Sequence, residues 1–305
     1  MQPTIGKLIQ QASTILLGKE EVLKLSIACM LARGHLLIED LPGVGKTTLA
    51  HTLAKLLGLH YQRIQFTSDL LPSDIIGVSI FDREKQSFRF HPGAIFSQLV
   101  LADEVNRATP KAQSALLEAM EEEQVTVEGD SMALPRPFFV IATQNPAHQI
   151  GTFPLPESQL DRFLMRLEIG YPGRKAERDL LCGRDRREML REMEQVIAPS
   201  ELITLQQQAD KVYIAEPLLD YCQDLLDFSR SSPRIHQGLS PRAGLALLRG
   251  ARAWAFVEGR DEVIPEDIQA VLAPIVGHRL QSTNEAGRGE GLGLADYLLQ
   301  SVAVP

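Results

Sequence analysis

The sequence predicts an α/β domain followed by an all-helical domain, and three observations support this fold class. Up to about residue 170, short apolar runs alternate with helical patterns, which is typical of parallel α/β units. Three of these runs are apolar without alternation, as in strands that are covered on both faces. After Tyr171-Pro172-Gly173 the strand patterns stop and helical patterns continue. We therefore expect two domains, at 1–170 and 171–305.

Five segments of the first domain have the length and composition of buried strands. They are His35–Glu39, Tyr61–Phe66, Gln98–Asp103, Phe138–Thr143 and Phe163–Ile169. In the second domain we expect helices over about 174–193, 199–211, 215–229, 241–257 and 265–276. Ser240-Pro241 is a capping residue followed by a helix-starting proline, and Pro265-Glu266-Asp267 repeats the proline start. We expect 229–240 to be a loop and the glycine-rich segment 287–293 to be mobile.

The composition argues against several classes of protein. The 305 residues carry a formal net charge of −8, which disfavours a domain built to coat phosphate backbones. The chain lacks 18 consecutive apolar residues and shows no secretory signal, so we expect neither a membrane span nor export. Cys29, Cys182 and Cys222 are dispersed, which fits a reducing compartment. We expect a soluble, cytoplasmic protein.

The segment Leu41-Pro42-Gly43-Val44-Gly45-Lys46-Thr47-Thr48 follows an apolar strand and precedes a helical pattern. Glycines let backbone N–H groups turn toward an anion, and the helix N-terminus adds partial positive charge. We expect residues 42–48 to bind nucleotide, with Lys46 on the β- and γ-phosphates and the Thr47 hydroxyl on Mg²⁺. The general pattern has glycine at the position of Asp40, so we expect that carboxylate to face away from the phosphates or to tilt the loop entry. The alternative is a simple glycine-rich turn.

Two carboxylates, Asp103 and Glu104, end the apolar strand that begins at Gln98. Charges at the end of a buried strand are costly unless a positive partner lies there. With the phosphate loop in the same sheet, nucleotide-bound Mg²⁺ is that partner. We expect Asp103 to hold the metal through water and Glu104 to orient or deprotonate the attacking water. The alternative is a solvated turn or a helix cap.

Three further residues are candidates for the same reaction. Asn145 follows the strand Phe138–Thr143, where its amide would lie beside the γ-phosphate, although Asn-Pro is also a common turn. Arg162 precedes the fifth strand, on the far side of the sheet from the phosphate loop, so we expect it to reach a neighbour's nucleotide. Arg242 lies in the first turn after Ser240. A guanidinium matches phosphoryl oxygens bidentately. The alternative for both arginines is a solvated ion pair.

With these motifs the chain resembles AAA+ ATPases and, more narrowly, the MoxR family over nearly its whole length. The narrow resemblance rests on segments 63–74, 101–108, 113–120, 142–146 and 155–163. It implies a P-loop NTPase αβα core with a five-stranded parallel sheet, followed by an all-helical lid. It also implies Lys46 and Thr47 in Walker A, Asp103 and Glu104 in Walker B, Asn145 as sensor 1, Arg162 as arginine finger and Arg242 as sensor 2. Asp40 is consistent with this family.

Two insertions in the first domain are similar to those of the AAA+ clade that includes magnesium chelatase and the replicative helicases. Residues 75–94 read as a hairpin around Arg83–Ser87, and 124–134 read as a second hairpin that turns at Glu128-Gly129-Asp130. In rings of this clade such inserts face the pore or a partner. The alternative is a pair of structural hairpins without a mobile role.

The resemblance implies an ATPase that uses ATP and Mg²⁺ to remodel, mature or insert metal into a partner protein. It implies self-assembly into a ring, most often of six subunits, and a partner with a von Willebrand factor A domain. One alternative is a nucleic-acid motor of the same clade, against which the acidic charge and the lack of a basic stripe count. Another is a scaffold that assembles on nucleotide with little turnover.

Overall fold

The computed structural model describes residues 1–127, 129–145, 152–283 and 291–305. A five-stranded sheet in the order β2-β5-β8-β1-β9 forms the centre of the first domain, and every neighbouring pair is parallel. The strands are β1 His35–Glu39, β2 Tyr61–Gln65, β5 Leu99–Asp103, β8 Phe139–Gln144 and β9 Phe163–Leu167. The predicted α/β class is confirmed, with each strand within two residues of its expected bounds.

Side chains along the central strands alternate between two apolar clusters, one on each face of the sheet. Leu36 and Leu101 belong to the cluster that is covered by α1 (Pro3–Ile15), α2 (Glu20–Leu31) and α3 (Lys46–Leu56). Leu37 and Val100 belong to the other cluster, which is covered by α5 (Pro110–Glu122). Because both faces are buried, these strands carry apolar residues without alternation, as the sequence predicted.

The second domain is helical, as expected, with three local differences. The expected helix 174–193 is two helices, α7 (Arg174–Cys182) and α8 (Arg186–Glu192), because the chain is extended at Gly183, where a Cβ would lie 2.5 Å from the Asp179 carbonyl. The expected loop 229–240 contains β10 (Ile235–Gln237), which pairs antiparallel with β11 (Gln281–Ser282). Residues 287–290 lie outside the described part of the chain, whereas 291–293 open the helix α13 (Gly291–Ser301).

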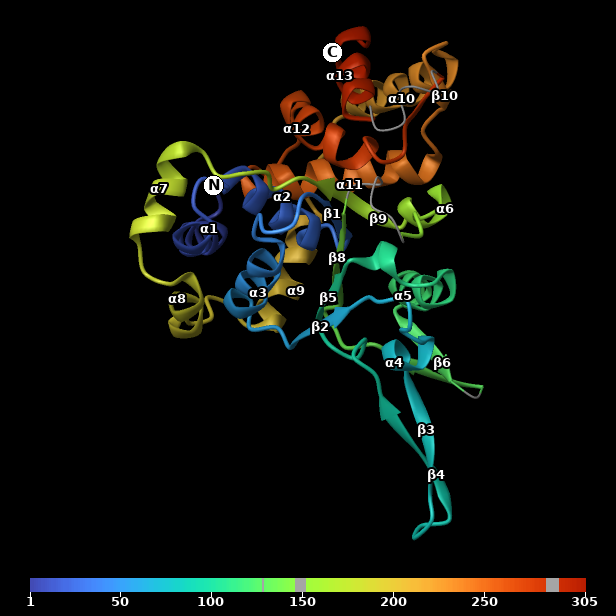
Figure 1. The fold of residues 1–305 in the computed structure, drawn as a ribbon. Coiled ribbons are helices and arrows are strands. Elements are labelled where there is room, and N and C mark those ends of the chain that lie inside the picture. Colours follow the sequence, from blue (N-terminus) through green and yellow to red (C-terminus); the bar gives the residue numbers. More distant parts are fainter. Residues whose placement is uncertain (128, 146–151, 284–290) are drawn as a thin grey trace.

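The remaining lid helices follow the predicted pattern and include the helix that carries Arg242. They are α9 (Pro199–Ala209), α10 (Glu216–Ser231), α11 (Pro241–Val257) and α12 (Pro265–Val276). The Ser240 side chain accepts a hydrogen bond from the Ala243 N–H at 3.2 Å, so Ser240 caps α11. Figure 1 shows α10 to α13 on one side of the sheet, opposite the protruding hairpin.

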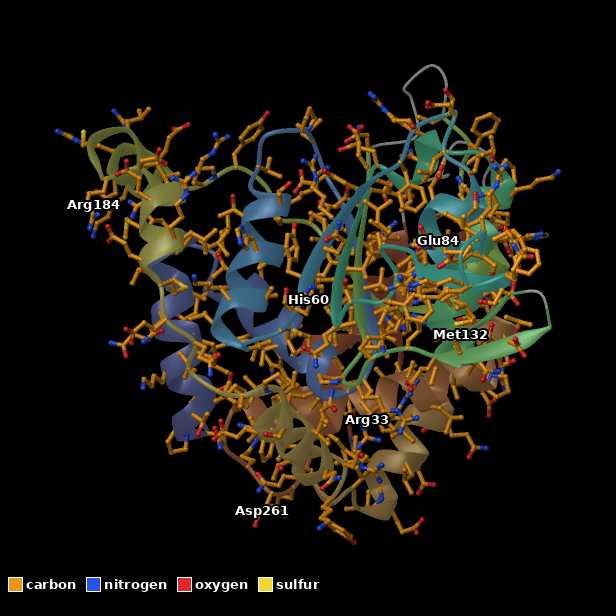
Figure 2. The ribbon with its side chains drawn as sticks, turned by 90° about the horizontal axis from the view of Figure 1, so that it is seen from below. Arg33, His60, Glu84, Met132, Arg184 and Asp261 are labelled. Carbon is orange, nitrogen blue, oxygen red and sulfur yellow. The ribbon has the colours of Figure 1, made fainter. Side chains whose placement is uncertain are left out.

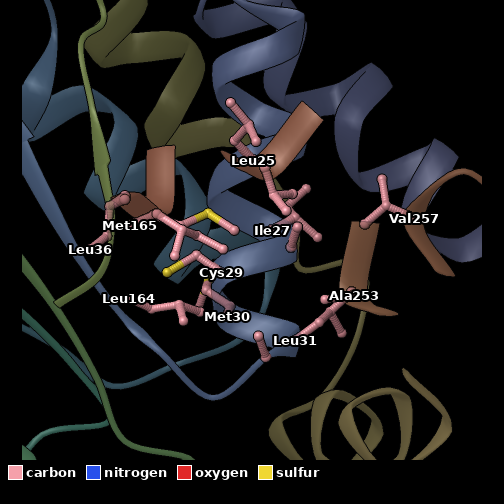
Figure 3. Packing of buried hydrophobic residues seen from close by; sticks show 14 of the residues in the cluster. Leu25, Ile27, Cys29, Met30, Leu31, Leu36, Leu164, Met165, Ala253 and Val257 are labelled. Carbon is pink, nitrogen blue, oxygen red and sulfur yellow. The ribbon is translucent and has the colours of Figure 1, made fainter. Parts of the chain in front are cut away.

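The lid helices and the α/β domain share one continuous apolar cluster. The buried helix α2 lies between β1 and β9 on one side and α11 on the other (Figure 3). Cys29 and Met30 of α2 lie near Met165 of β9, and Ile27 lies on the side that faces α11. Because burial of this cluster needs both parts, the helix α2 joins the lid to the sheet by packing and not only by chain connection.

Two hairpins extend the α/β domain at the predicted insertions. After the short helix α4 (Pro72–Ile76), β3 (Gly77–Asp82) pairs with β4 (Ser87–Pro92) and protrudes from the molecule (Figure 1). The second hairpin joins β6 (Gln124–Val127) to β7 (Asp130–Ala133), and Glu128 of its turn lies outside the described residues. In Figure 2, Glu84 and Met132 mark these hairpins on one side of the molecule, and Arg184 marks α7–α8 on the other.

The base of the first hairpin requires close backbone approach. A Cβ on Gly93 would lie 2.2 Å from the Ile75 carbonyl oxygen, and Gly77 has a φ of +102°. The hairpin itself exposes Ile80, Phe81 and Phe88. Across the described residues, no helix combines the length and apolar character that crossing a bilayer requires.

Candidate functional site

The predicted phosphate loop connects β1 to α3 at the carboxyl edge of the sheet. Gly43 and Gly45 have φ values of +87° and +103°, which favour glycine and turn successive N–H groups toward one side of the loop. Lys46 opens α3, followed by Thr47, which is exposed, and Thr48. Pro42 is exposed and Val44 is half-buried. The local geometry is that of an anion cradle at a helix N-terminus.

Lys46 is a buried cation whose hydrogen-bond acceptors are neutral oxygens. Its side chain lies against the loop with the residue only 8% exposed, and Nζ donates to the Asp40 carbonyl at 2.5 Å and to Asn145 Oδ1 at 3.3 Å. Burial lowers the pKa of Lys46, and the nearby Asp40, Asp103 and Glu104 partly offset this effect. A buried ammonium with neutral acceptors provides strong attraction for an incoming anion.

The acidic pair at the end of β5 is held by Thr143 of β8. Thr143 Oγ1 donates to Asp103 Oδ1 at 2.6 Å and accepts from the Glu104 backbone N–H at 2.8 Å. Glu104 has a φ of +57° and a ψ of +49°, a left-handed conformation that costs a non-glycine residue about 1 kcal/mol or more. Strained residues of this kind cluster at functional sites.

Asn145 connects the cation of the loop to the second acid. Its Oδ1 accepts from Lys46 Nζ, and its Nδ2 donates to Glu104 Oε1 at 3.0 Å. Its backbone carbonyl accepts from Asn106 Nδ2 at 3.1 Å, which fixes the end of β8 against η1 (Val105–Arg107). The structure thus brings together Lys46, Asn145 and Glu104, three residues that the sequence placed at one site from separate motifs.

Two polar residues of β2 also contact the acids, and neither was among the predicted site residues. Arg63 donates from Nε and Nη2 to Asp103 Oδ2, at 3.1 and 2.7 Å. Gln65 donates to Glu104 Oε2 at 3.0 Å, and Arg107 Nε lies 3.2 Å from the same oxygen. The spacing of Arg63 and Gln65, two residues apart on one strand, was the available signal, because it places both on one face.

Asp40 lies at the loop entry with its carboxylate directed away from the cradle. The expectation that it faces away from the phosphates agrees with its contacts, because Oδ1 accepts an N–H at the loop entry and Oδ2 accepts two N–H groups beyond β9. Oδ1 accepts from Leu41, and Oδ2 accepts from Ile169 and Gly170. The carboxylate therefore joins the phosphate loop to the chain that leaves β9.

The two predicted arginines meet on one carboxylate. Glu121, near the C-terminus of α5, lies 2.9 Å from Arg162 through Oε2 and 2.8 Å from Arg242 through Oε1. Asp161 approaches Arg242 at 3.7 Å and accepts a hydrogen bond from Arg279 at 2.6 Å. These side chains line a cavity of about 230 Å³ together with Arg249. The solvated ion pair that the sequence left open is therefore present, and it includes both arginines.

This arginine cluster and the phosphate loop lie at opposite edges of the sheet. Arg162 precedes the first residue of β9, which pairs with His35 at the start of β1, whereas the loop follows the end of β1. Five residues of strand, about 15 Å, separate these edges. The structure therefore places Arg242 beside Arg162 and away from the phosphate loop of its own chain.

His35 anchors α5 near the arginine cluster. The ring is buried, its Nε2 lies 3.1 Å from the Met120 carbonyl, and its Nδ1 accepts from the Val140 N–H at 3.0 Å. Burial lowers its pKa to about 4, so the ring is neutral and donates from Nε2. His278 is also buried, and its pKa lies well below the ordinary value. Each ring lies within hydrogen-bond distance of a backbone carbonyl, His35 of Met120 and His278 of Phe163, which fits a structural role for both.

The residues at the carboxyl edge fit a magnesium–nucleotide. The cradle is open where a side chain would fill it, since a Cβ built on Gly43 would meet no heavy atom within 4 Å. Lys46 offers a buried positive charge, and Thr47 and Asp103 offer the hydroxyl and carboxylate oxygens that Mg²⁺ prefers. Within the described residues, no group of three or more His, Cys, Asp or Glu side chains could hold a metal alone. Thr47 and Asp103 together offer one hydroxyl and one carboxylate, which suits a metal that takes further oxygen ligands from a phosphate.

Comparison with known proteins agrees with this geometry. Residues 35–165 match the family described as "ATPase family associated with various cellular activities (AAA)", and residues 227–291 match the "AAA lid domain". The chain is 44% identical to the Bacillus subtilis protein YeaC, over all of this chain and 96% of that protein. It is 36% identical to Chaperone MoxR1 of Mycobacterium tuberculosis, over 99% of this chain and 82% of that protein.

A solved structure shows the same fold over nearly the whole chain. It is a crystal structure of a candidate ATPase from Cytophaga hutchinsonii, with a TM-score of 0.88 and 35% sequence identity. The superposition covers 99% of this chain and 95% of that one. The similarity therefore includes both the α/β domain and the helical lid.

Proposed function

The chain belongs to the MoxR family of AAA+ ATPases, and we propose that it hydrolyses ATP in a ring to remodel a partner protein. The observation that carries the ATPase proposal is the continuous contact from Lys46 through Asn145 to Glu104. It connects a phosphate-binding cation, an amide and a carboxylate in one line. Hydrolysis of a nucleotide needs these three groups together at its terminal phosphate.

In the proposed reaction, the loop N–H groups and Lys46 hold the β- and γ-phosphates. Thr47 and Asp103 hold Mg²⁺, which when bound neutralises charge on these phosphates. Glu104 accepts a proton from a water that Asn145 orients, and the water oxygen forms a bond to the γ-phosphorus. The bond between that phosphorus and the bridging oxygen breaks, so that ADP and phosphate leave.

Arg162 and Arg242 complete the site of a neighbouring subunit. Both lie on the edge of the sheet opposite to their own phosphate loop and share Glu121, so one contact surface presents both guanidinium groups. Two guanidinium groups stabilise negative charge that develops on the transferred phosphoryl group. The sequence left open whether Arg242 acts on the nucleotide of its own subunit or of the neighbour. The carboxylate that it shares with Arg162 supports action on the neighbour for both residues.

Glu104→Gln tests the assignment of the base. The variant should bind ATP as the natural chain does and should lose about a hundredfold or more of its phosphate release, because the amide cannot take the proton. Glu188→Gln on the exposed surface of α8 is the matched control. ATP and GTP are compared in the same assay, since the loop contacts recognise phosphates and not the base. Unchanged phosphate release by Glu104→Gln would remove that residue from the mechanism.

Mixed assemblies test the shared site. Arg162→Ala subunits retain a complete phosphate loop, whereas Lys46→Ala subunits retain both arginines. Mixing the two inactive variants should therefore restore part of the activity, at the contacts where an intact phosphate loop meets an intact pair of arginines. Absence of restored activity, with co-assembly verified by light scattering, would contradict action on the neighbour.

The partner is proposed to be a protein with a von Willebrand factor A domain, and the ring to contain six subunits. A chaperone role is supported by the name of the relative Chaperone MoxR1 and by the exposed apolar side chains of β3 and β4. The Glu104→Gln chain loaded with ATP should retain a purified domain that carries an Asp-x-Ser-x-Ser metal motif. Equal retention of that domain without nucleotide, or by the β3–β4 deletion, would argue against ATP-driven remodelling through this hairpin.

A further inference from the structure

Asp40 occupies a position where the general phosphate-loop pattern has glycine. Glycine at that position leaves the start of the loop without a side chain, so a carboxylate there introduces contacts that the general pattern lacks. Asp40 takes no part in the proposed hydrolysis. Its contacts nevertheless involve the loop, the end of the sheet and the start of the chain toward the lid.

The Asp40 carboxylate accepts three backbone hydrogen bonds. Leu41 N–H donates to Oδ1 at 2.7 Å, Ile169 N–H donates to Oδ2 at 2.7 Å, and Gly170 N–H donates to Oδ2 at 2.6 Å. Bonds from N–H groups to an ionised carboxylate are roughly twice as strong as neutral ones. Two of the three donors lie just beyond β9, 129 and 130 residues along the chain.

The same segment is held from its other side by Lys19. Lys19 Nζ donates to the Ile169 carbonyl at 2.6 Å and to the Tyr171 carbonyl at 2.8 Å. Between them, Gly170 has a φ of +66°, a conformation that suits glycine. Residues 169–171 are thus held on both sides, because their N–H groups donate to the Asp40 carboxylate and their carbonyls accept from the Lys19 ammonium. This is the first segment after β9 on the way to α7 and the lid helices.

The backbone of Asp40 is in contact with the proposed nucleotide-binding cation. Lys46 Nζ donates to the Asp40 carbonyl at 2.5 Å, and the Asp40 N–H donates to the Gln144 carbonyl at 3.3 Å. A phosphate that draws Lys46 away therefore removes a charged donor from the residue whose carboxylate binds 169–170. Asp40 therefore contacts the phosphate-binding cation through its carbonyl and residues 169–170 through its carboxylate.

We propose that Asp40 is a positioning residue that couples occupancy of the phosphate loop to the path of residues 169–171. The proposal rests on nucleotide binding at this loop, and it names the residue through which binding is transmitted toward the lid. Asp40 is the residue that departs from the general loop pattern, and this role accounts for that departure. The group that responds is the pair of amides at Ile169 and Gly170.

Amide hydrogen exchange of the full chain tests the coupling directly. In Asp40→Gly, exchange at Ile169 and Gly170 should become roughly ten- to a hundredfold faster, because both N–H groups lose a charged acceptor. In the natural chain, ATPγS with Mg²⁺ should change exchange at these two amides, and in Asp40→Gly that change should be absent. Asp40→Ala, which also lacks an acceptor for the two N–H groups, provides the same test if the glycine variant folds poorly.

Glu39→Gln is the matched control, because Glu39 precedes Asp40 and its carboxylate lies 3.2 Å from Arg166 of β9. It does not contact the two linker amides, so exchange there should remain within about twofold of the natural chain. Unchanged exchange in Asp40→Gly, or a nucleotide response that survives in it, would overturn the proposal. An equal increase of exchange in Glu39→Gln would also overturn the proposal, because removing any carboxylate at the end of β1 would then have the same effect.

Kinetics separate this role from a purely structural one. Asp40→Gly should bind a fluorescent ATP analogue within about threefold of the natural affinity, since glycine suits the loop, and should lose about tenfold in kcat. A loss confined to affinity would contradict the coupling. If the natural chain binds ATP without hydrolysing it, the ATPase proposal fails, while the exchange experiment still decides the role of Asp40.

Discussion

Replacing His35 by glutamine should remove one identifiable part of the protein's sensitivity to acid. The buried ring donates from Nε2 to the Met120 carbonyl and accepts from the Val140 N–H, and burial lowers its pKa to about 4. The unfolded chain binds a proton near the ordinary histidine pKa of about 6.5. Between these two values the unfolded state holds more protons, so the free energy of unfolding falls as the pH falls.

The magnitude follows from the two pKa values. One pH unit between them corresponds to about 1.4 kcal/mol, so lowering the pH from about 7.5 to about 5.0 should cost about 2 kcal/mol through His35 alone. In His35→Gln, the amide can donate to Met120 and accept from Val140, but it takes up no proton. Over the same pH range, the free energy of unfolding of the variant should therefore fall by about 2 kcal/mol less than that of the natural chain.

Guanidinium denaturation of both chains at several pH values measures this difference. His278 has a lowered pKa in both chains, so its contribution cancels when the two curves are subtracted. Two parallel curves between about pH 7.5 and 5.0 would refute the reasoning, because His35 would then titrate alike in the folded and unfolded states. A resonance assigned to His35 that titrates near the ordinary histidine pKa in the folded protein would refute it independently.

Two other side chains offer tests of the site. Glu121→Gln should lower kcat about tenfold with unchanged ATP affinity, because Arg162 and Arg242 lose the carboxylate that aligns them. Phosphate release over an ATP titration measures both quantities, and a natural kcat would contradict the alignment. Arg63→Ala should lower the Mg²⁺ concentration needed for nucleotide binding about threefold or more, because the guanidinium and the metal compete for Asp103. A fluorescent-nucleotide titration checks this, and an unchanged Mg²⁺ midpoint would count against it.

The parts of the fold that the sequence predicted are those with strong local patterns. The central strands could be recognised because both of their faces are buried, and the phosphate loop because its glycines, lysine and threonine all lie within residues 43–47. The break at Gly183 was missed because helical spacing continues on both sides of it. The short strand β10 was missed because its partner, β11, lies more than 40 residues later.

The contacts that long-range pairing creates could not be predicted from the sequence. Arg63 reaches Asp103 because β2 lies beside β5, an order that local patterns do not specify. Glu121 joins Arg162 to Arg242 only because α11 packs near the end of α5. Asp40 was recognised as an unusual residue, but its partners at 169 and 170 follow from the parallel pairing of β1 with β9. Residue type predicted the candidates, and topology determined their partners.

If neighbouring copies share sites as proposed, each copy holds the complementary halves of two different composite sites, because the phosphate loop and the arginine pair lie at opposite margins of one sheet. Contacts between unlike surfaces of identical copies either close on themselves or continue as an open fibre. In a closed assembly every loop finds an arginine pair, whereas an open row leaves one loop at its end without one. The rate of ATP turnover per copy would then report whether the assembly is closed. It would be highest only when the last copy contacts the first.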